Sequence, residues 1–107
     1  MTIEIKDLEF LSIIGILDFE RVTPQKVSVN CRIDYVYKGD FLNYALVAEQ
    51  IENTMKIEQF ELIEEALLHL KSTLKRDFPR IDTLFLKISK PDILANCEVS
   101  LSETFNY

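Results

Sequence analysis

The sequence lacks several residue types that common chemical sites need. Its 107 residues include no tryptophan, one histidine, two cysteines and only two glycines. Phosphate-binding loops need clustered glycines, so a nucleotide site of that kind is excluded. Cys31 and Cys97 stand far apart, without the paired spacing of zinc sites, and we expect no bound metal. We predict that both thiols are reduced and lie in the core.

Long hydrophobic runs and clusters of basic residues are absent as well. The apolar stretch at residues 8–17 is too short for a membrane helix and lacks the basic start of a signal peptide. The net charge of −6 argues against nucleic acids and anionic membranes as partners. We therefore predict a cytoplasmic protein whose partner is a small molecule of little or no charge.

The pattern of apolar residues predicts a single domain over residues 1–107, with elements in the order ββααββ. Period-two alternation indicates strands and the 3.6-residue period indicates helices, the first of them capped by Asn43. The expected elements are strands at 2–17 and 26–37, helices at 44–57 and 60–77, and strands at 83–89 and 93–101. The strand connections are too short for parallel crossovers. The sequence therefore predicts an α+β fold, with one antiparallel four-stranded sheet and both helices on one face.

The edge strands of such a sheet are long and contain β-branched residues. Exposed edges of this kind need cover, because their unpaired backbone groups form bonds with other strands. Pairing with further copies of the chain is one way to cover them. We therefore predict a homo-oligomer.

Four polar residues need an interpretation, and two of them, Glu64 and Tyr44, have more than one. Glu64 falls on the apolar stripe of the second helix. It either reaches water at the edge of the stripe or faces a pocket and accepts paired N–H bonds from a ligand. Tyr44 either packs at a helix start or offers its hydroxyl as a proton relay in a cleft. On pattern alone, Glu20 is a solvated loop charge and Lys90 is the charged end of a strand that Pro91 stops.

Five motifs, in order along the chain, resemble those of the dihydroneopterin aldolase family. The motifs are IGILDFER with Gly15 and Glu20, PQKVSVN, NYALVAEQIE with Tyr44, FELIEEAL with Glu64, and LKISKPD with Lys90 and Pro91. The resemblance covers about residues 2–105. It implies the tunnelling fold, in which the sheets of several subunits join into a barrel. It also implies a homo-tetramer or homo-octamer with sites between adjacent subunits.

The resemblance further implies a reaction in folate biosynthesis. The enzyme is a carbon–carbon lyase that cleaves 7,8-dihydroneopterin into 6-hydroxymethyl-7,8-dihydropterin and glycolaldehyde by a retro-aldol step. The C6=N5 imine of the substrate accepts the electrons of the broken bond, so neither a metal, a cofactor nor a Schiff base is required. Lys90 and Tyr44 then serve acid–base chemistry, with Glu20 as an orienting group.

Substrate binding is implied for three further positions. Glu64 holds the 2-amino and N3 edge of the pterin. Backbone groups of Ile63 and, from the neighbouring subunit, of Leu42 assist it. The segment YKGDFLNY before the first helix is shorter than in the family. This difference leaves the contact from Leu42, and the choice between tetramer and octamer, open.

Two alternative functions remain open at this point. An epimerase acting on dihydroneopterin or its triphosphate would share the fold and the same four residue types. A non-catalytic oligomeric module that binds pterins would share the fold without the reaction, because fold alone does not establish function.

Overall fold

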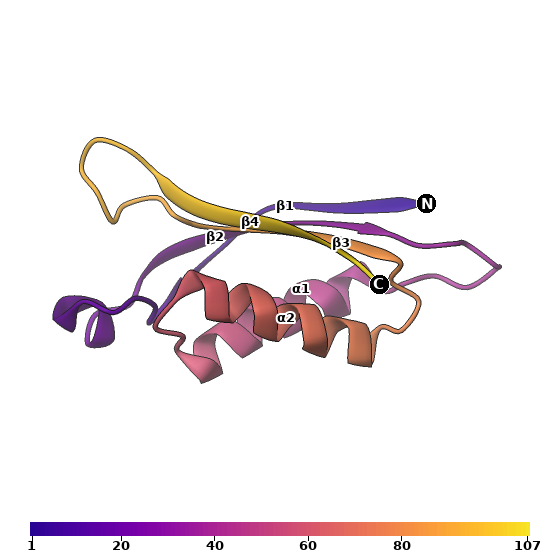
Figure 1. Cartoon of the computed structure of the whole chain (residues 1–107), viewed down its shortest axis with the longest axis horizontal. Helices are drawn as coiled ribbons and strands as arrows, with labels where there is room; N and C mark the ends of the chain where they lie inside the picture. The colour runs from indigo at the N-terminus through magenta and orange to yellow at the C-terminus, as the bar shows by residue number, and fades with distance from the viewer.

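The computed structural model describes residues 1–107 as a four-stranded antiparallel sheet with two helices packed on one face (Figure 1). The elements are β1 (Thr2–Ser12), the short 3-10 helix η1 (Asp18–Arg21), β2 (Gln25–Asp34), α1 (Tyr44–Glu58), α2 (Ile63–Asp77), β3 (Thr83–Lys90) and β4 (Val99–Asn106). The sheet order is β1-β2-β3-β4, so β1 and β4 are the edge strands. This arrangement confirms the predicted α+β fold. Neither helix is long and apolar enough to cross a membrane.

The core lies between the helices and one face of the sheet. Alternate residues of β2, namely Val27, Val29, Cys31 and Ile33, are buried there, as period-two alternation requires. The helices contribute the apolar stripes that the 3.6-residue period predicts. The buried helix residues are Val47, Ile51 and Met55 of α1 and Ile63, Ala66, Leu67, Leu70 and Leu74 of α2.

The strand register defines two ends of the sheet. At one end lie η1, the 59–62 connection between the helices and the 91–98 connection after β3; we call it the η1 end. At the other end Met1 accepts a bond from the Tyr35 N–H at 2.8 Å; we call it the Tyr35 end. Helix α1 begins at the Tyr35 end and α2 begins at the η1 end, so the helices run in opposite directions (Figure 1).

The structure corrects the last predicted strand and one of the two cysteines. We expected a strand at 93–101, but residues 93–98 lie in the irregular connection after β3, and β4 runs from Val99, opposite Lys90, to Asn106. Cys97 therefore lies exposed in a connection, and the prediction of a core thiol there is wrong. Cys31 is buried, as predicted, and burial raises the pKa of its thiol to about 12.

Three other boundaries differ by a few residues. The first strand ends at Ser12 instead of residue 17, because Gly15 has a φ of 121° and redirects the chain. The second strand ends at Asp34 instead of residue 37. The second helix begins at Ile63 instead of residue 60. The Asn43 cap is confirmed, because its Oδ1 accepts bonds from the N–H groups of Ala45 and Leu46 at 3.0 and 3.2 Å.

Candidate functional site

The η1 end contains a buried ion pair between Glu20 and Lys90. The Lys90 Nζ lies 2.9 Å from the Glu20 Oε2, and the two side chains are 12% and 2% exposed. Glu20 comes from η1 and Lys90 from the last position of β3. The structure thus brings two predicted site residues together. The interpretations from pattern alone, a solvated loop charge and an exposed strand end, are wrong.

Glu20 has further partners besides Lys90. Its Oε2 accepts a bond from the Gln25 Nε2 at 2.8 Å, and its Oε1 accepts one from the Leu17 N–H at 3.3 Å. Burial by itself raises the pKa of the Glu20 carboxyl. The bonds from Lys90, Gln25 and Leu17 outweigh that effect, so its pKa lies below the ordinary value. Glu20 is therefore a carboxylate at neutral pH.

Gln25 is a site residue that the sequence reasoning missed. It is the first residue of β2, and its amide nitrogen also donates to the Ile14 carbonyl at 2.8 Å. Both bonds come from one nitrogen, so they fix the side chain against the Glu20 carboxylate. The signal was present in the motif PQKVSVN, where Gln25 follows Pro24.

Gly15 makes room for the Glu20 carboxylate. A Cβ atom at this position would overlap all three atoms of that carboxyl group. The φ of 121° is also one that side-chain-bearing residues rarely adopt. Glycine is therefore required here for two independent reasons.

Glu64 and Ile63 lie in the first turn of α2, which starts at the η1 end. Ile63 is buried in the core, while Glu64 is exposed and lines a hollow of about 230 Å³ between α2 and the edge strand β4. No side chain caps α2, so the N–H groups of its first turn are open to a ligand.

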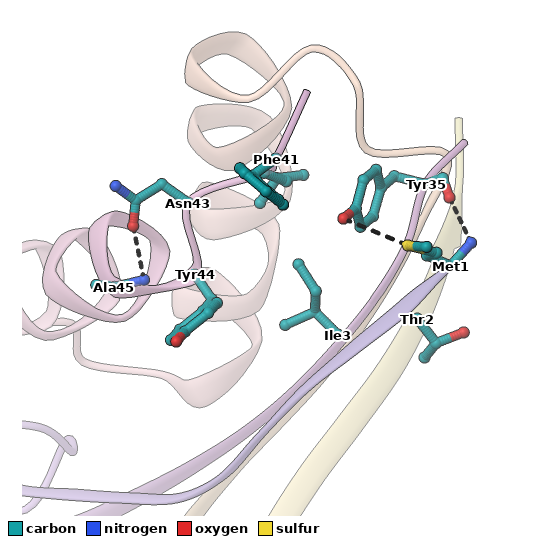
Figure 2. A pocket seen from close by; sticks show the side chains of 9 residues that line it. Met1, Thr2, Ile3, Tyr35, Phe41, Asn43, Tyr44 and Ala45 are labelled. Carbon is teal, nitrogen blue, oxygen red and sulfur yellow. Dashed lines mark hydrogen bonds between the residues drawn. The ribbon is translucent and has the colours of Figure 1, made fainter. Parts of the chain in front are cut away.

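Tyr44 and Leu42 lie at the opposite end of the sheet, where both line a hollow of about 570 Å³. Tyr44 is the first residue of α1 and is 65% exposed, while Leu42 is buried. Figure 2 shows Tyr44 on the helix side of the hollow, with Ile3 and Tyr35 across from it. The residues that line the hollow are Met1, Thr2, Ile3, Tyr35, Phe41, Leu42, Asn43, Tyr44 and Ala45.

A single chain does not bring Tyr44 to Lys90. The hollow of Tyr44 includes Thr2, which pairs with Asp34, and Asp34 pairs with Thr83 at the start of β3. Lys90 ends the same strand. At about 3.3 Å per residue, the two ends of β3 lie roughly 23 Å apart. The six predicted site residues therefore fall into two groups, with Glu20, Lys90, Glu64 and Ile63 toward the η1 end and Tyr44 and Leu42 at the Tyr35 end.

The structure gathers no group of three or more His, Cys, Asp or Glu side chains in an arrangement that could hold a metal ion. The chemistry that the η1 end offers is that of an ammonium and a carboxylate held together away from water. In such a pair the carboxylate can orient the ammonium, which is the proton donor, and stay ionised itself.

Comparison with known families gives a match over most of the chain. The family model described as dihydroneopterin aldolase matches residues 3–102. A comparison with curated proteins gives no match.

Solved structures with the same fold include two bacterial proteins of nearly equal length. One, from Vibrio cholerae and described as a dihydroneopterin aldolase, has a TM-score of 0.90 at 19% identity and covers 100% of this chain and 98% of its own. The dihydroneopterin aldolase of E. coli, solved in complex with neopterin, has a TM-score of 0.89 at 22% identity, with 99% of each chain covered.

A urate oxidase from Bacillus sp. TB-90 is similar over part of its length. It has a TM-score of 0.79 at 9% identity and covers 99% of this chain but only 47% of the oxidase. Together these likenesses confirm the tunnelling fold for this chain. The barrel itself is an assembly of copies and stays a prediction.

Replacing Gly15 by alanine should destabilise the protein more than the same change at Gly39. Both glycines have a positive φ, of 121° and 93°, but only Gly15 lies against another group, while Gly39 has open space around it. We expect Gly15→Ala to lower the free energy of unfolding by about 3 kcal/mol or more and Gly39→Ala by about 1 kcal/mol. Urea denaturation measures both, and equal losses would contradict the packing of Glu20 on Gly15.

Proposed function

The chain belongs to the dihydroneopterin aldolase family, and on that premise we propose that it cleaves 7,8-dihydroneopterin into 6-hydroxymethyl-7,8-dihydropterin and glycolaldehyde, a step in folate biosynthesis. The observation that supports this most strongly is the buried pair of Glu20 and Lys90. A buried ion pair contributes little net stability, because removing two charges from water offsets their attraction. Its presence at the end of β3 is therefore better explained by chemistry than by folding.

The reaction needs four proton transfers near one another. The 2′-hydroxyl loses its proton, the electrons of the C1′–C2′ bond move through C6 to N5, and N5 gains a proton. Glycolaldehyde leaves, C1′ then takes up a proton, and N5 loses its own to give the product. Lys90 exchanges these protons as an acid–base catalyst, while the electrons stay within the pterin ring. Glu20, held by Gln25, orients the ammonium of Lys90.

Substrate binding falls to the first turn of α2. The Glu64 carboxylate accepts bonds from the 2-amino group and N3 of the pterin, a two-point contact strengthened by charge. The uncapped backbone at Ile63 adds to it. The E. coli relative was solved with neopterin, which supports a pterin as the ligand class.

Tyr44 and Leu42 reach the site from a neighbouring copy. The hollow of Tyr44 is lined by residues of β1, and the hollow of Glu64 is lined by residues of β4. These are the two edge strands, so pairing the β4 edge of one copy with the β1 edge of the next brings the two hollows toward each other. Repeating this contact closes a ring, and we propose a homo-tetramer, alone or stacked as a homo-octamer.

Lys90→Ala should abolish most turnover while leaving pterin binding nearly intact. We expect glycolaldehyde release to fall about 10²- to 10⁴-fold, the usual effect of losing an acid–base group, since Glu64 still holds the pterin. Lys87→Ala is the matched control, because Lys87 lies on the same strand but is exposed on the other face of the sheet. Cleavage at the wild-type rate by Lys90→Ala would show that the assignment is wrong.

The same product assay separates the alternatives for the wild-type protein. Glycolaldehyde release indicates cleavage. A change of configuration at C2′ without glycolaldehyde indicates an epimerase. Binding of the substrate with neither product indicates a non-catalytic pterin-binding module.

Glu64→Gln should weaken neopterin binding about 10- to 100-fold, because hydrogen bonds to a charged group contribute roughly 1.5–3 kcal/mol. The neighbouring Glu65 is also exposed in the first turn of α2, so Glu65→Gln is the control and should bind neopterin normally. Fluorescence titration measures both dissociation constants. Equal affinities would place the pterin elsewhere.

Mixing two inactive variants tests whether the site is shared between copies. Oligomers co-expressed from Tyr44→Phe and Lys90→Ala chains should recover about a quarter of the wild-type activity, since a random ring pairs an intact Tyr44 with an intact Lys90 at that frequency. Co-expression of Glu20→Gln with Lys90→Ala should recover none, because both changes lie in the same half of the site. No recovery in the first mixture would mean that Tyr44 and Lys90 do not act across copies.

A further inference from the structure

The guanidinium group of Arg21 binds three main-chain carbonyls in two different loops. Its Nη1 donates to the Gly15 carbonyl at 3.0 Å and to the Phe60 carbonyl at 3.2 Å. Its Nη2 donates to the Gln59 carbonyl at 2.9 Å. None of the ion pairs in the chain includes Arg21. Its positive charge therefore lies against backbone carbonyl oxygens and is not paired with a carboxylate.

Arg21 joins the loop beside the proposed acid–base pair to the loop that precedes the proposed pterin-binding turn. The loop of Gly15 leads into η1 and packs on the Glu20 carboxylate. The connection at 59–62 ends α1 and leads directly into the first turn of α2, where Glu64 lies. One backbone bond also joins the loops, from the Gly15 N–H to the Phe60 carbonyl at 3.1 Å. Arg21 adds a second and wider link beside it.

Arginine suits this position for electrostatic and geometric reasons. The carbonyls of Gln59 and Phe60 lie at the C-terminal end of α1, where the helix dipole favours a positive charge. The planar fork of arginine presents several N–H groups in fixed directions, so it can hold two loops at once. Lysine has the charge but not the fork.

We propose that Arg21 is a positioning residue that sets the distance between the Glu20–Lys90 pair and the start of α2. The inference rests on the proposed function, because the distance matters only if Glu64 holds a pterin whose side chain must meet Lys90. A displacement of about 1 Å between binding and reacting groups can reduce the rate by about 10²-fold. Loss of Arg21 therefore affects the reaction more than the binding.

Arg21→Gln and Arg21→Lys in the full-length chain test this role, with glycolaldehyde release and neopterin binding measured on the same samples. We expect kcat to fall about 10- to 100-fold, with the neopterin dissociation constant within about threefold of wild type. A third variant, Arg21→Ala, leaves space for added guanidinium ion, which should restore part of its kcat. Arg76→Gln is the control, because Arg76 pairs with Asp77 at the far end of α2.

The possible outcomes are distinct. If Arg21 has a purely structural role, its variants will unfold at a lower temperature but keep the wild-type kcat at temperatures well below unfolding. That result overturns the proposal. A loss of neopterin binding as large as the loss of kcat also overturns it. If Arg21→Gln does not fold, the kcat of Arg21→Lys and the guanidinium rescue decide. Absence of glycolaldehyde release by the wild-type protein would overturn the proposed function itself, whereas an active wild type with unaffected Arg21 variants overturns only this inference.

Discussion

The buried carboxylate of Glu20 is the constraint on which the η1 end depends. An ionised carboxylate out of water costs several kcal/mol unless cations and hydrogen bonds compensate for the lost hydration. The compensation comes from separate parts of the chain: Lys90 at the end of β3, Gln25 at the start of β2 and the Leu17 N–H before η1. The lack of a side chain at Gly15 leaves the space. One charge thereby fixes where three elements meet.

The division of the predicted site between two ends of the sheet follows from the length of α1. Its 15 residues extend about 22 Å at 1.5 Å per residue, which is close to the distance of roughly 23 Å between the two ends of β3. Tyr44 is the first residue of the helix, and the 59–62 connection at the η1 end follows its last residue. Within one chain, the length of α1 therefore keeps Tyr44 away from the η1 end. A ligand that needs both Tyr44 and Lys90 has to lie between copies. Assembly through the edge strands and completion of the site then become the same event.

The sequence predicted the layers and the helices well, because both depend on local periodicity. It failed at β4 for the same reason: Ala95 and Cys97 alternate with the polar Asn96 and Glu98 as in a strand, but pairing with β3 begins only at Val99. The burial of Glu20 has no local signal, since its partner Lys90 lies 70 residues away. The resemblance to a family supplied that pairing. Gln25 and Arg21 were missed because they bond to main-chain carbonyls, which any residue provides.

The charge state of the pair assigns the two roles within it. The hydrogen bonds that Glu20 accepts keep its pKa below the ordinary value, so at neutral pH it takes up no proton. A carboxylate of such low basicity is a poor acceptor for the proton of the 2′-hydroxyl in the proposed reaction. Lys90 has three N–H donors, and Glu20 engages one of them. The other two can be donated to a substrate: in the proposed reaction Lys90 gives one proton to N5, and the amine left behind accepts the proton of the 2′-hydroxyl, while Glu20 orients it.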